Sequence, residues 1–339
     1  LLAEPVQPED VILEPYYPDT QTARSDIAQH YNNIHEMDRQ VGEILNRLQE
    51  DGLMDKTIVI WTADHGDGLP RAKRDLFDSG IKVPMIVRWP DGWGRGTVVD
   101  RLVSFIDLAP TILRLANVPV PEHMQGSDFV EGPPRDFVYA SRDRIDDFYD
   151  RRRAVRDHQF KYIKNWYPEK PSGHGLSYRD NIPMVRELWR LLEANQLTDD
   201  QRKWFQPSGG EELYRLSDDP HELNNLAGNL DFARDRQRLH SQLERRLQEI
   251  GDYSELMERD MVSEFNPGGI VPLTSSPTFD VTGGVLEVET HAASIGYRVN
   301  DGPWLLYFKP LGVEPGDRVT TKAIRYGWQE SEAAEYLVP

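Results

Sequence analysis

The adjacent pair Asp64-His65 is the first candidate for chemistry in this sequence. It follows the apolar run Thr57–Thr62, and Gly66 comes directly after it. Such a run is typical of a strand covered on both faces, as in the parallel sheet of an α/β fold. Ligands bind beyond the carboxyl ends of these strands, where a carboxylate and an imidazole can share one divalent cation. A plain polar turn is the alternative interpretation, because two-residue motifs are weak signals.

A basic loop follows within ten residues and carries Arg71, Lys73 and Arg74. The whole chain has a formal net charge of -18, so a compact group of cations beside a metal-ligand pair stands out. We interpret the loop as a clamp for an anion. The alternative is a solvated run of charges, which is the usual fate of such a segment.

A third charged cluster comprises Arg142, Asp143 and Arg144, with the triple Arg151–Arg153 close behind. One interpretation is a set of surface ion pairs. The other is that Arg142, Asp143 and Arg144 line the mouth of a pocket and select a substrate.

Composition excludes several classes of protein. The 339 residues are strongly acidic, which argues against nucleic-acid binding. There is no cysteine, so disulfides, thiolate metal sites and cysteine nucleophiles are excluded. No run approaches the roughly 18 apolar residues of a membrane span. The first twenty residues are rich in proline and acids, unlike a signal peptide, and we expect them to be a loop from within a longer protein.

The elements that would position these residues follow from apolar periodicity. Residues 22–50 have one apolar face at helical spacing. Strands are predicted at 57–62, 83–89 and 102–106, followed by a helix from Asp107, its expected N-cap, through Leu115. This order predicts part of a doubly wound α/β sheet.

The pattern changes near residue 135. Short alternating runs predict a small antiparallel sheet with strands at 137–140, 153–156, 160–163 and 212–215, and helices at 183–195, 199–204 and 231–250. Alternation returns after residue 283 and predicts a β-sandwich-like, immunoglobulin-like module. We therefore divide the chain into an α/β core (1–134), an antiparallel-sheet subdomain (135–251), a linker (252–270) and a β module (271–339).

Several ordered motifs give the chain a family resemblance. They are Thr57–Gly66, Lys73–Pro84, Met85–Pro90, Val103–Thr111, Pro121–Gly126, Glu212–Pro220 and Asn224–Ala227. Together they resemble the C-terminal part of the type I, formylglycine-dependent sulfatases of the alkaline phosphatase superfamily. The segments Arg71–Lys73 and Arg142–Arg144 are most similar to the sulfamidase-like, glycan-acting branch.

The resemblance implies a site. Asp64 and His65 would hold a divalent cation, which is usually calcium, although His65 also admits manganese or zinc. Lys73 would be catalytic and would grip the sulfate, while Arg71, Arg142, Asp143 and Arg144 would bind the rest of the substrate. The family's nucleophile lies in a Cys/Ser-x-Pro-x-Arg motif that this sequence lacks. We therefore expect a companion N-terminal half, from the same gene or a separate chain, to supply the nucleophile.

The resemblance also implies an activity. We expect a bacterial sulfuric ester hydrolase, periplasmic or secreted, that acts on a sulfated carbohydrate. One alternative is a phosphoester or phosphonate hydrolase of the same superfamily. Another is a non-catalytic protein that binds glycans through its β module.

Overall fold

A computed structural model describes residues 5–144, 148–282, 285–290 and 293–339. The chain forms two compact units, Leu1–Asp252 (unit 1) and Tyr253–Pro339 (unit 2). The finer division of the first unit near residue 134 stays a prediction. Across the described ranges, no helix combines the length and the apolar character that crossing a membrane requires.

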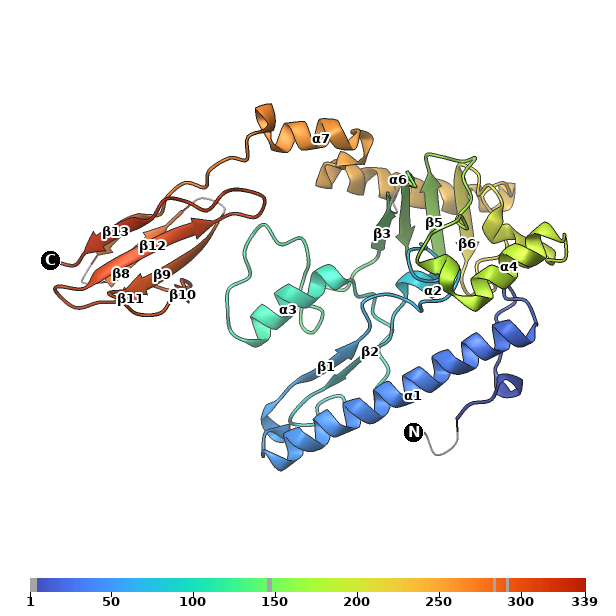
Figure 1. The fold of residues 1–339 in the computed structure, drawn as a ribbon, viewed down its shortest axis with the longest axis horizontal. Helices are drawn as coiled ribbons and strands as arrows, with labels where there is room; N and C mark the ends of the chain where they lie inside the picture. The colour runs from blue at the N-terminus through green and yellow to red at the C-terminus, as the bar shows by residue number, and fades with distance from the viewer. Residues whose placement is uncertain (1–4, 145–147, 283–284, 291–292) are drawn as a thin grey trace. The chain divides into compact units, whose positions relative to one another are not determined.

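Unit 1 combines helices with two antiparallel sheets (Figure 1). Its helices are α1 (Gln21–Glu50), α2 (Asp78–Ile81), α3 (Leu108–Leu115), α4 (Pro183–Glu193), α5 (Asp199–Arg202) and α6 (Ala233–Ile250). Its strands are β1 (Val59–Thr62), β2 (Met85–Arg88), β3 (Val138–Arg142), β4 (Arg152–Arg156), β5 (Phe160–Asn165) and β6 (Glu211–Arg215).

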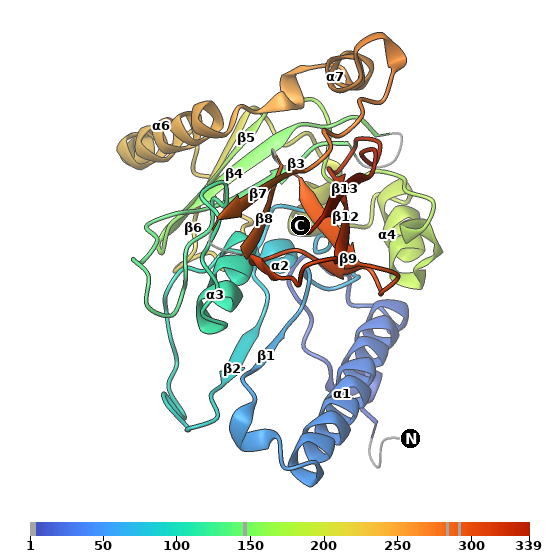
Figure 2. The same ribbon diagram turned by 90° about the vertical axis from the view of Figure 1, so that its left-hand side faces the viewer.

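Strands β3 to β6 form an antiparallel meander, which confirms the small sheet predicted from alternating residues. Helix α6 lies along this sheet (Figure 2). Its Leu239 and Leu243, four residues apart, pack with Val155, Tyr162 and Leu213. Side chains of a strand alternate between faces, so the neighbouring residues of β4 and β5 point to the opposite face.

That opposite face positions the candidate site. Ala154, Ile163 and Tyr214 there pack against Leu76 and Phe77, which belong to the segment between the basic loop and α2. The basic loop is therefore held by the sheet through a hydrophobic contact that is distant in sequence.

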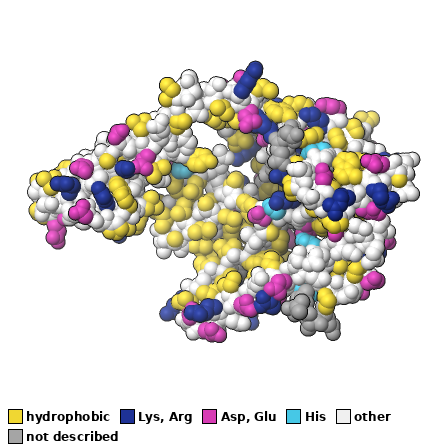
Figure 3. All heavy atoms as spheres, viewed as in Figure 1, with side chains coloured by type: hydrophobic (Ala, Val, Ile, Leu, Met, Phe, Trp, Pro, Cys, Tyr) yellow, Lys and Arg dark blue, Asp and Glu magenta, His cyan; other side chains and the backbone are white. Residues whose placement is uncertain are grey.

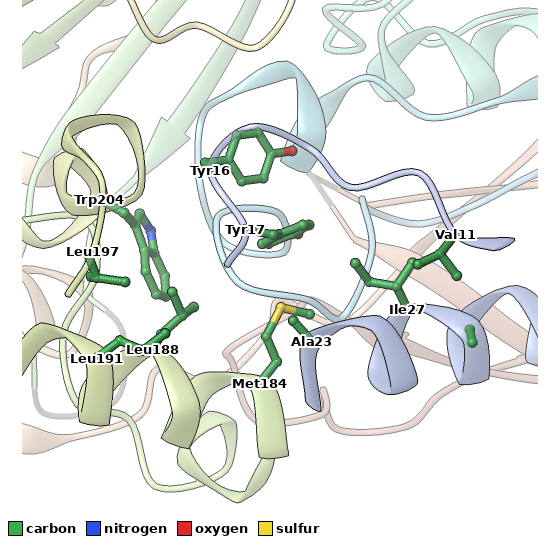
Figure 4. Close-up of a cluster of buried hydrophobic side chains, with 11 residues drawn as sticks. Val11, Tyr16, Tyr17, Ala23, Ile27, Met184, Leu188, Leu191, Leu197 and Trp204 are labelled. Carbon is green, nitrogen blue, oxygen red and sulfur yellow. The ribbon is translucent and has the colours of Figure 1, made fainter. Parts of the chain in front are cut away.

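Helix α1 begins at the predicted place, where the Thr20 side chain accepts a hydrogen bond from the Ala23 amide. Only its first turns are buried, through Ala23, Ile27 and Ala28. They meet α4 and Trp204 in one cluster with Tyr16 and Tyr17 (Figure 4). Further along α1, Ile34, Met37 and Ile44 are exposed, although the sequence placed them on the apolar face.

The predicted parallel arrangement of the first strands is wrong in this unit. Strand β1 pairs with β2 in antiparallel register, with Thr62 opposite Met85. A loop with one short helix joins them, whereas a parallel pair needs a full crossover connection.

The predicted strand at 102–106 is also wrong. A 3-10 turn, Phe105–Asp107, lies there and leads into α3. The Asp107 carboxylate accepts hydrogen bonds from the Ser104 and Ser127 amides and pairs with Arg135. The Ser104 amide, which a strand would offer to a neighbour, is thus satisfied locally.

Unit 2 contains a β-sandwich, as predicted, and helix α7 (Glu258–Phe265), which lies within the range predicted to be a linker. One sheet has the order β10-β9-β12-β13 and the other β11-β8-β7. The strands are β7 (Thr278–Thr282), β8 (Val285–Glu289), β9 (Ser294–Val299), β10 (Leu305–Leu306), β11 (Leu311–Gly312), β12 (Arg318–Ile324) and β13 (Ala334–Leu337). Leu286, Val288, Ile295, Leu311 and Val319 form the core between the sheets.

Candidate functional site

Asp64 and His65 lie just beyond the end of β1, where the sequence placed them. The Asp64 carboxylate Oδ2 is 3.2 Å from the His65 Nε2, and the Asp64 side chain is 83% exposed. The His65 Nδ1 lies 2.7 Å from the Gly66 carbonyl, and a carbonyl can only accept. Nδ1 therefore donates to this carbonyl, which leaves Nε2 facing the Asp64 carboxylate.

This arrangement fits a cation. The His65 Nε2 and the Asp64 Oδ2 lie 3.2 Å apart, so both atoms can contact one ion. A hydrogen bond donated by the other ring nitrogen to a carbonyl is a usual way to orient a metal-binding histidine. Within the described residues, no third His, Asp or Glu joins the pair in a metal-ligating group. The two residues can thus supply part of a coordination shell.

Two glycines fold the segment after the pair back on itself. The Gly66 amide donates to the Gly80 carbonyl at 3.0 Å. A Cβ atom on Gly66 would lie 1.8 Å from the Ser79 carbonyl oxygen, and one on Gly80 would lie 2.3 Å from the carbonyl oxygens of Ala72 and Asp75. These close approaches explain why glycine occupies both positions.

The basic loop between these glycines has a constrained backbone. Arg71 and Arg74 adopt left-handed φ angles of 62° and 73°. Such angles are unfavourable for residues with a Cβ atom and persist where the surroundings impose them. The Lys73 amide donates to the Asp67 carbonyl at 3.0 Å, so Lys73 is held near the turn that carries His65.

Arg71 anchors the start of the loop. Its guanidinium donates to the carbonyls of His221 and Glu222 at 2.8 and 2.7 Å, and it stacks over the Phe77 ring at 3.8 Å. The residue is buried. These contacts occupy the guanidinium and indicate a positioning role.

Asp75 provides a second anchor. Its buried carboxylate pairs with Arg142 and accepts a hydrogen bond from the Trp204 indole at 3.0 Å. Arg142 is buried as well, and its Nε lies 2.9 Å from Asp150. Arg142 therefore supports the loop from its position in β3. The sequence had instead suggested that Arg142 lines the mouth of a pocket.

Asp78 provides a third anchor. It lies 2.6 Å from the ammonium of Lys161, which is completely buried, and its amide donates to the Glu222 carboxylate. Lys161 and Arg156 hold the pKa of Asp78 below its usual value against the opposing effect of burial. Burial raises the pKa of Glu222, whose Oε1 lies 2.7 Å from the same Lys161 ammonium.

Lys73 differs from its anchored neighbours. Its side chain is half-buried, and within the described part of the chain no carboxylate lies within ion-pair distance of its ammonium. The Tyr178 ring is 6.0 Å away. Lys73 is thus a cation that the fold positions next to the Asp64-His65 turn and leaves available for an anion.

The other members of the third cluster have separate surroundings. The Asp143 carboxylate is 2.8 Å from Arg153, and Arg144 lies over the Tyr149 ring at 5.1 Å. Asp143 and Arg153 line a cavity of about 330 Å³ between β3 and α6. Asp143 thus lies at this cavity, whereas Arg142 contacts the loop of Lys73 through Asp75.

His30 and His174 were missed by sequence reasoning, because each depends on partners that are distant in sequence. The Nε2 of His30, from α1, lies 3.0 Å from Asp67, and this contact raises its pKa. His174 is buried and stacks on Phe148 at 3.6 Å. Burial, together with Arg142 and Arg179, lowers the pKa of His174 to about 4.

Comparison of the sequence with known proteins identifies relatives of this chain. The sulfatase family matches residues 9–118, and the family described as N-sulphoglucosamine sulphohydrolase, C-terminal, matches residues 71–171. An ulvan-active sulfatase of Formosa agariphila is 36% identical over 95% of this chain and 56% of its own length. The N-sulphoglucosamine sulphohydrolase of Homo sapiens is 29% identical over 70% of this chain and 50% of its own. The chain thus spans about half the length of these relatives.

Solved structures share the fold. A 2-O GAG sulfatase superposes with a TM-score of 0.54 at 21% identity, covering 72% of this chain and 47% of its own. A protein solved with its substrate D-glucosamine-2-N,6-O-disulfate gives a TM-score of 0.51 at 22% identity, covering 70% and 43%.

The lowered pKa of His174 predicts an acid-dependent loss of stability. Below its ordinary pKa of 6.5, the unfolded chain binds a proton that the folded chain does not bind until about pH 4. The free energy of unfolding should therefore fall by about 3 kcal/mol between pH 6.5 and 4 through this residue. In His174→Phe, which keeps the ring against Phe148, that part of the slope should vanish in urea titrations.

Exposed His158 provides the control. His158→Phe should retain the wild-type slope. An unchanged slope in His174→Phe would contradict the assignment.

Proposed function

We propose that the chain, which matches the sulfatase family over residues 9–118, forms part of the active site of a sulfuric ester hydrolase. The observation that carries the proposal is the placement of Lys73. Its loop is held beside the Asp64-His65 turn by Arg71, Asp75 and Asp78, and within the described residues its ammonium has no ion-pair partner. A sulfate ester requires such local positive charge, since the whole chain is strongly acidic.

We propose a sulfated carbohydrate as the substrate. The relatives are named for ulvan, for N-sulphoglucosamine and for N-acetylglucosamine 6-O-sulfate. Their common chemistry is a sugar that carries a sulfate group. Asp143 and Arg144 remain candidates for contacts with that sugar, whereas the buried Arg71 and Arg142 act by positioning the loop.

Asp64 and His65 would hold a divalent cation, and we propose calcium, with manganese or zinc as the ions that an imidazole also admits. When bound, the cation would polarise the sulfate oxygens. Lys73 would bind the sulfate and stabilise the negative charge that develops on the leaving oxygen.

We propose that a companion polypeptide completes the site. The pair Asp64-His65 makes only part of a coordination shell, and a formylglycine nucleophile requires a motif that this sequence lacks. Apolar side chains gather over α3 and the β1-β2 pair (Figure 3). Ile86, Ile106 and Ile112 are exposed there. The polypeptide that corresponds to the remaining length of the relatives would cover this surface.

We propose that the enzyme acts outside the cytoplasm. Sulfated polysaccharides are too large and too highly charged to diffuse through a membrane. An extracellular sulfatase of Drosophila melanogaster is 37% identical over 27% of this chain.

Lys73→Ala should lower the turnover of a sulfate ester by about a hundredfold or more in the full enzyme, since a preplaced charge is lost. Lys82→Ala removes an exposed lysine of the same segment and should leave turnover unchanged. Unchanged turnover in Lys73→Ala would contradict the proposal that Lys73 binds the sulfate group. Hydrolysis of phosphate esters alone would contradict the sulfatase proposal.

Asp64→Ala should abolish tight metal binding in the full enzyme, because the exposed carboxylate is one of two donors from this chain. Elemental analysis after dialysis measures the metal content per chain. Asp55→Ala, which removes another exposed carboxylate, should retain the metal. Retention in Asp64→Ala would refute its assignment as a ligand.

A further inference from the structure

Trp304 forms an aromatic platform on the outer face of the sheet β10-β9-β12-β13 in unit 2. Its ring lies over Gly296 of β9, since a Cβ atom on that glycine would be 3.6 Å from Trp304 Cε3. The residue is 45% exposed. The absence of a side chain at Gly296 lets the indole lie against the sheet while part of it faces solvent.

Cations flank this ring. Arg298, two residues beyond Gly296 in β9, has its guanidinium carbon 5.2 Å from the ring centroid. Lys322, the cross-strand partner of Gly296 in β12, has its ammonium 5.9 Å from the centroid. Alternation along β12 places Arg318 on the same face as Lys322, since Val319, Thr321 and Ala323 are buried on the other.

The charge of this face contrasts with that of its unit. Residues 253–339 contain 13 acidic and 6 basic residues, and three of the six basic residues lie on this one face, together with Glu335, the cross-strand partner of Thr320. Within the described residues, Arg298 has no ion-pair partner and its Nε has no hydrogen-bond acceptor. Lys322 pairs with Glu330, which a ligand anion would have to displace.

We propose that this face binds a sulfated polysaccharide. A sugar ring would stack on Trp304 through its apolar C–H face, and flanking sulfate groups would pair with Arg298 and Lys322. An aromatic ring with two cations within 6 Å of its centroid is chemically suited to a sugar ring that carries anionic groups. The site belongs to unit 2 and would retain a polymeric substrate, so the inference rests on the proposed function for its biological context.

Isothermal titration of the 339-residue chain with ulvan tests this proposal. Wild type should bind ulvan, and Trp304→Ala should weaken binding at least tenfold. Arg298→Ala should weaken it as well. Glu330→Gln should strengthen it, because Lys322 loses its competing carboxylate. Phe265→Ala, which removes an exposed aromatic residue of α7, is the matched control and should bind as wild type does.

Two further probes separate stacking from charge. Desulfated ulvan should bind at least tenfold more weakly than ulvan, and polyphosphate, which has no sugar ring, should bind equally to wild type and Trp304→Ala. Absence of ulvan binding by wild type, or equal binding by Trp304→Ala, would overturn the proposal. Hydrolysis of 4-nitrophenyl sulfate by the full enzyme should be unaffected by Trp304→Ala, so the failure of this site and the failure of the sulfatase proposal are distinguishable.

Discussion

The buried carboxylate of Asp75 is the contact on which the candidate site depends. It joins the basic loop to β3 through Arg142. It also joins the loop to Trp204, which packs in one cluster with residues of α1 and α4. A buried charge is tolerated only when it is paired, and removal of one partner typically costs about 3–5 kcal/mol. Arg71 fixes the loop on one side through the carbonyls of His221 and Glu222, and Asp78 fixes it on the other through its ion pair with Lys161. The charged groups of Arg71, Asp75 and Asp78 all contact other parts of unit 1. The ammonium of Lys73 remains available for a ligand.

The sequence predicted the positions in the fold of those candidate residues whose signals are local, while their roles stay a proposal. Asp64-His65 follows an apolar strand, and Lys73 lies in a basic loop in an acidic chain; both patterns can be read within ten residues. The small antiparallel sheet and the β-sandwich followed from alternation. The direction of β2 could not be predicted in this way, since alternation determines which face a residue occupies but not its partner strand.

Long-range pairing explains the other differences. Arg142 is 67 residues from Asp75, so spacing could not distinguish a buried anchor from a substrate contact. His174 owes its lowered pKa to burial and to two arginines that the fold brings to it. Trp304 became informative only when the register of β9 and β12 placed Arg298 and Lys322 on its face. The role of each of these three residues depends on neighbours that only the tertiary structure brings into contact with it.

Amide hydrogen exchange of the loop tests the central claim most directly, namely that buried ion pairs hold Lys73 in place. The Lys73 amide donates to Asp67 and the Gly66 amide to Gly80, so both should be protected in the wild-type chain. In Asp75→Asn, both should exchange at least tenfold faster, while strand β8 of unit 2 serves as the unchanged reference. Rapid exchange of these amides in the wild type, or protection that is unaltered by Asp75→Asn, would contradict the account.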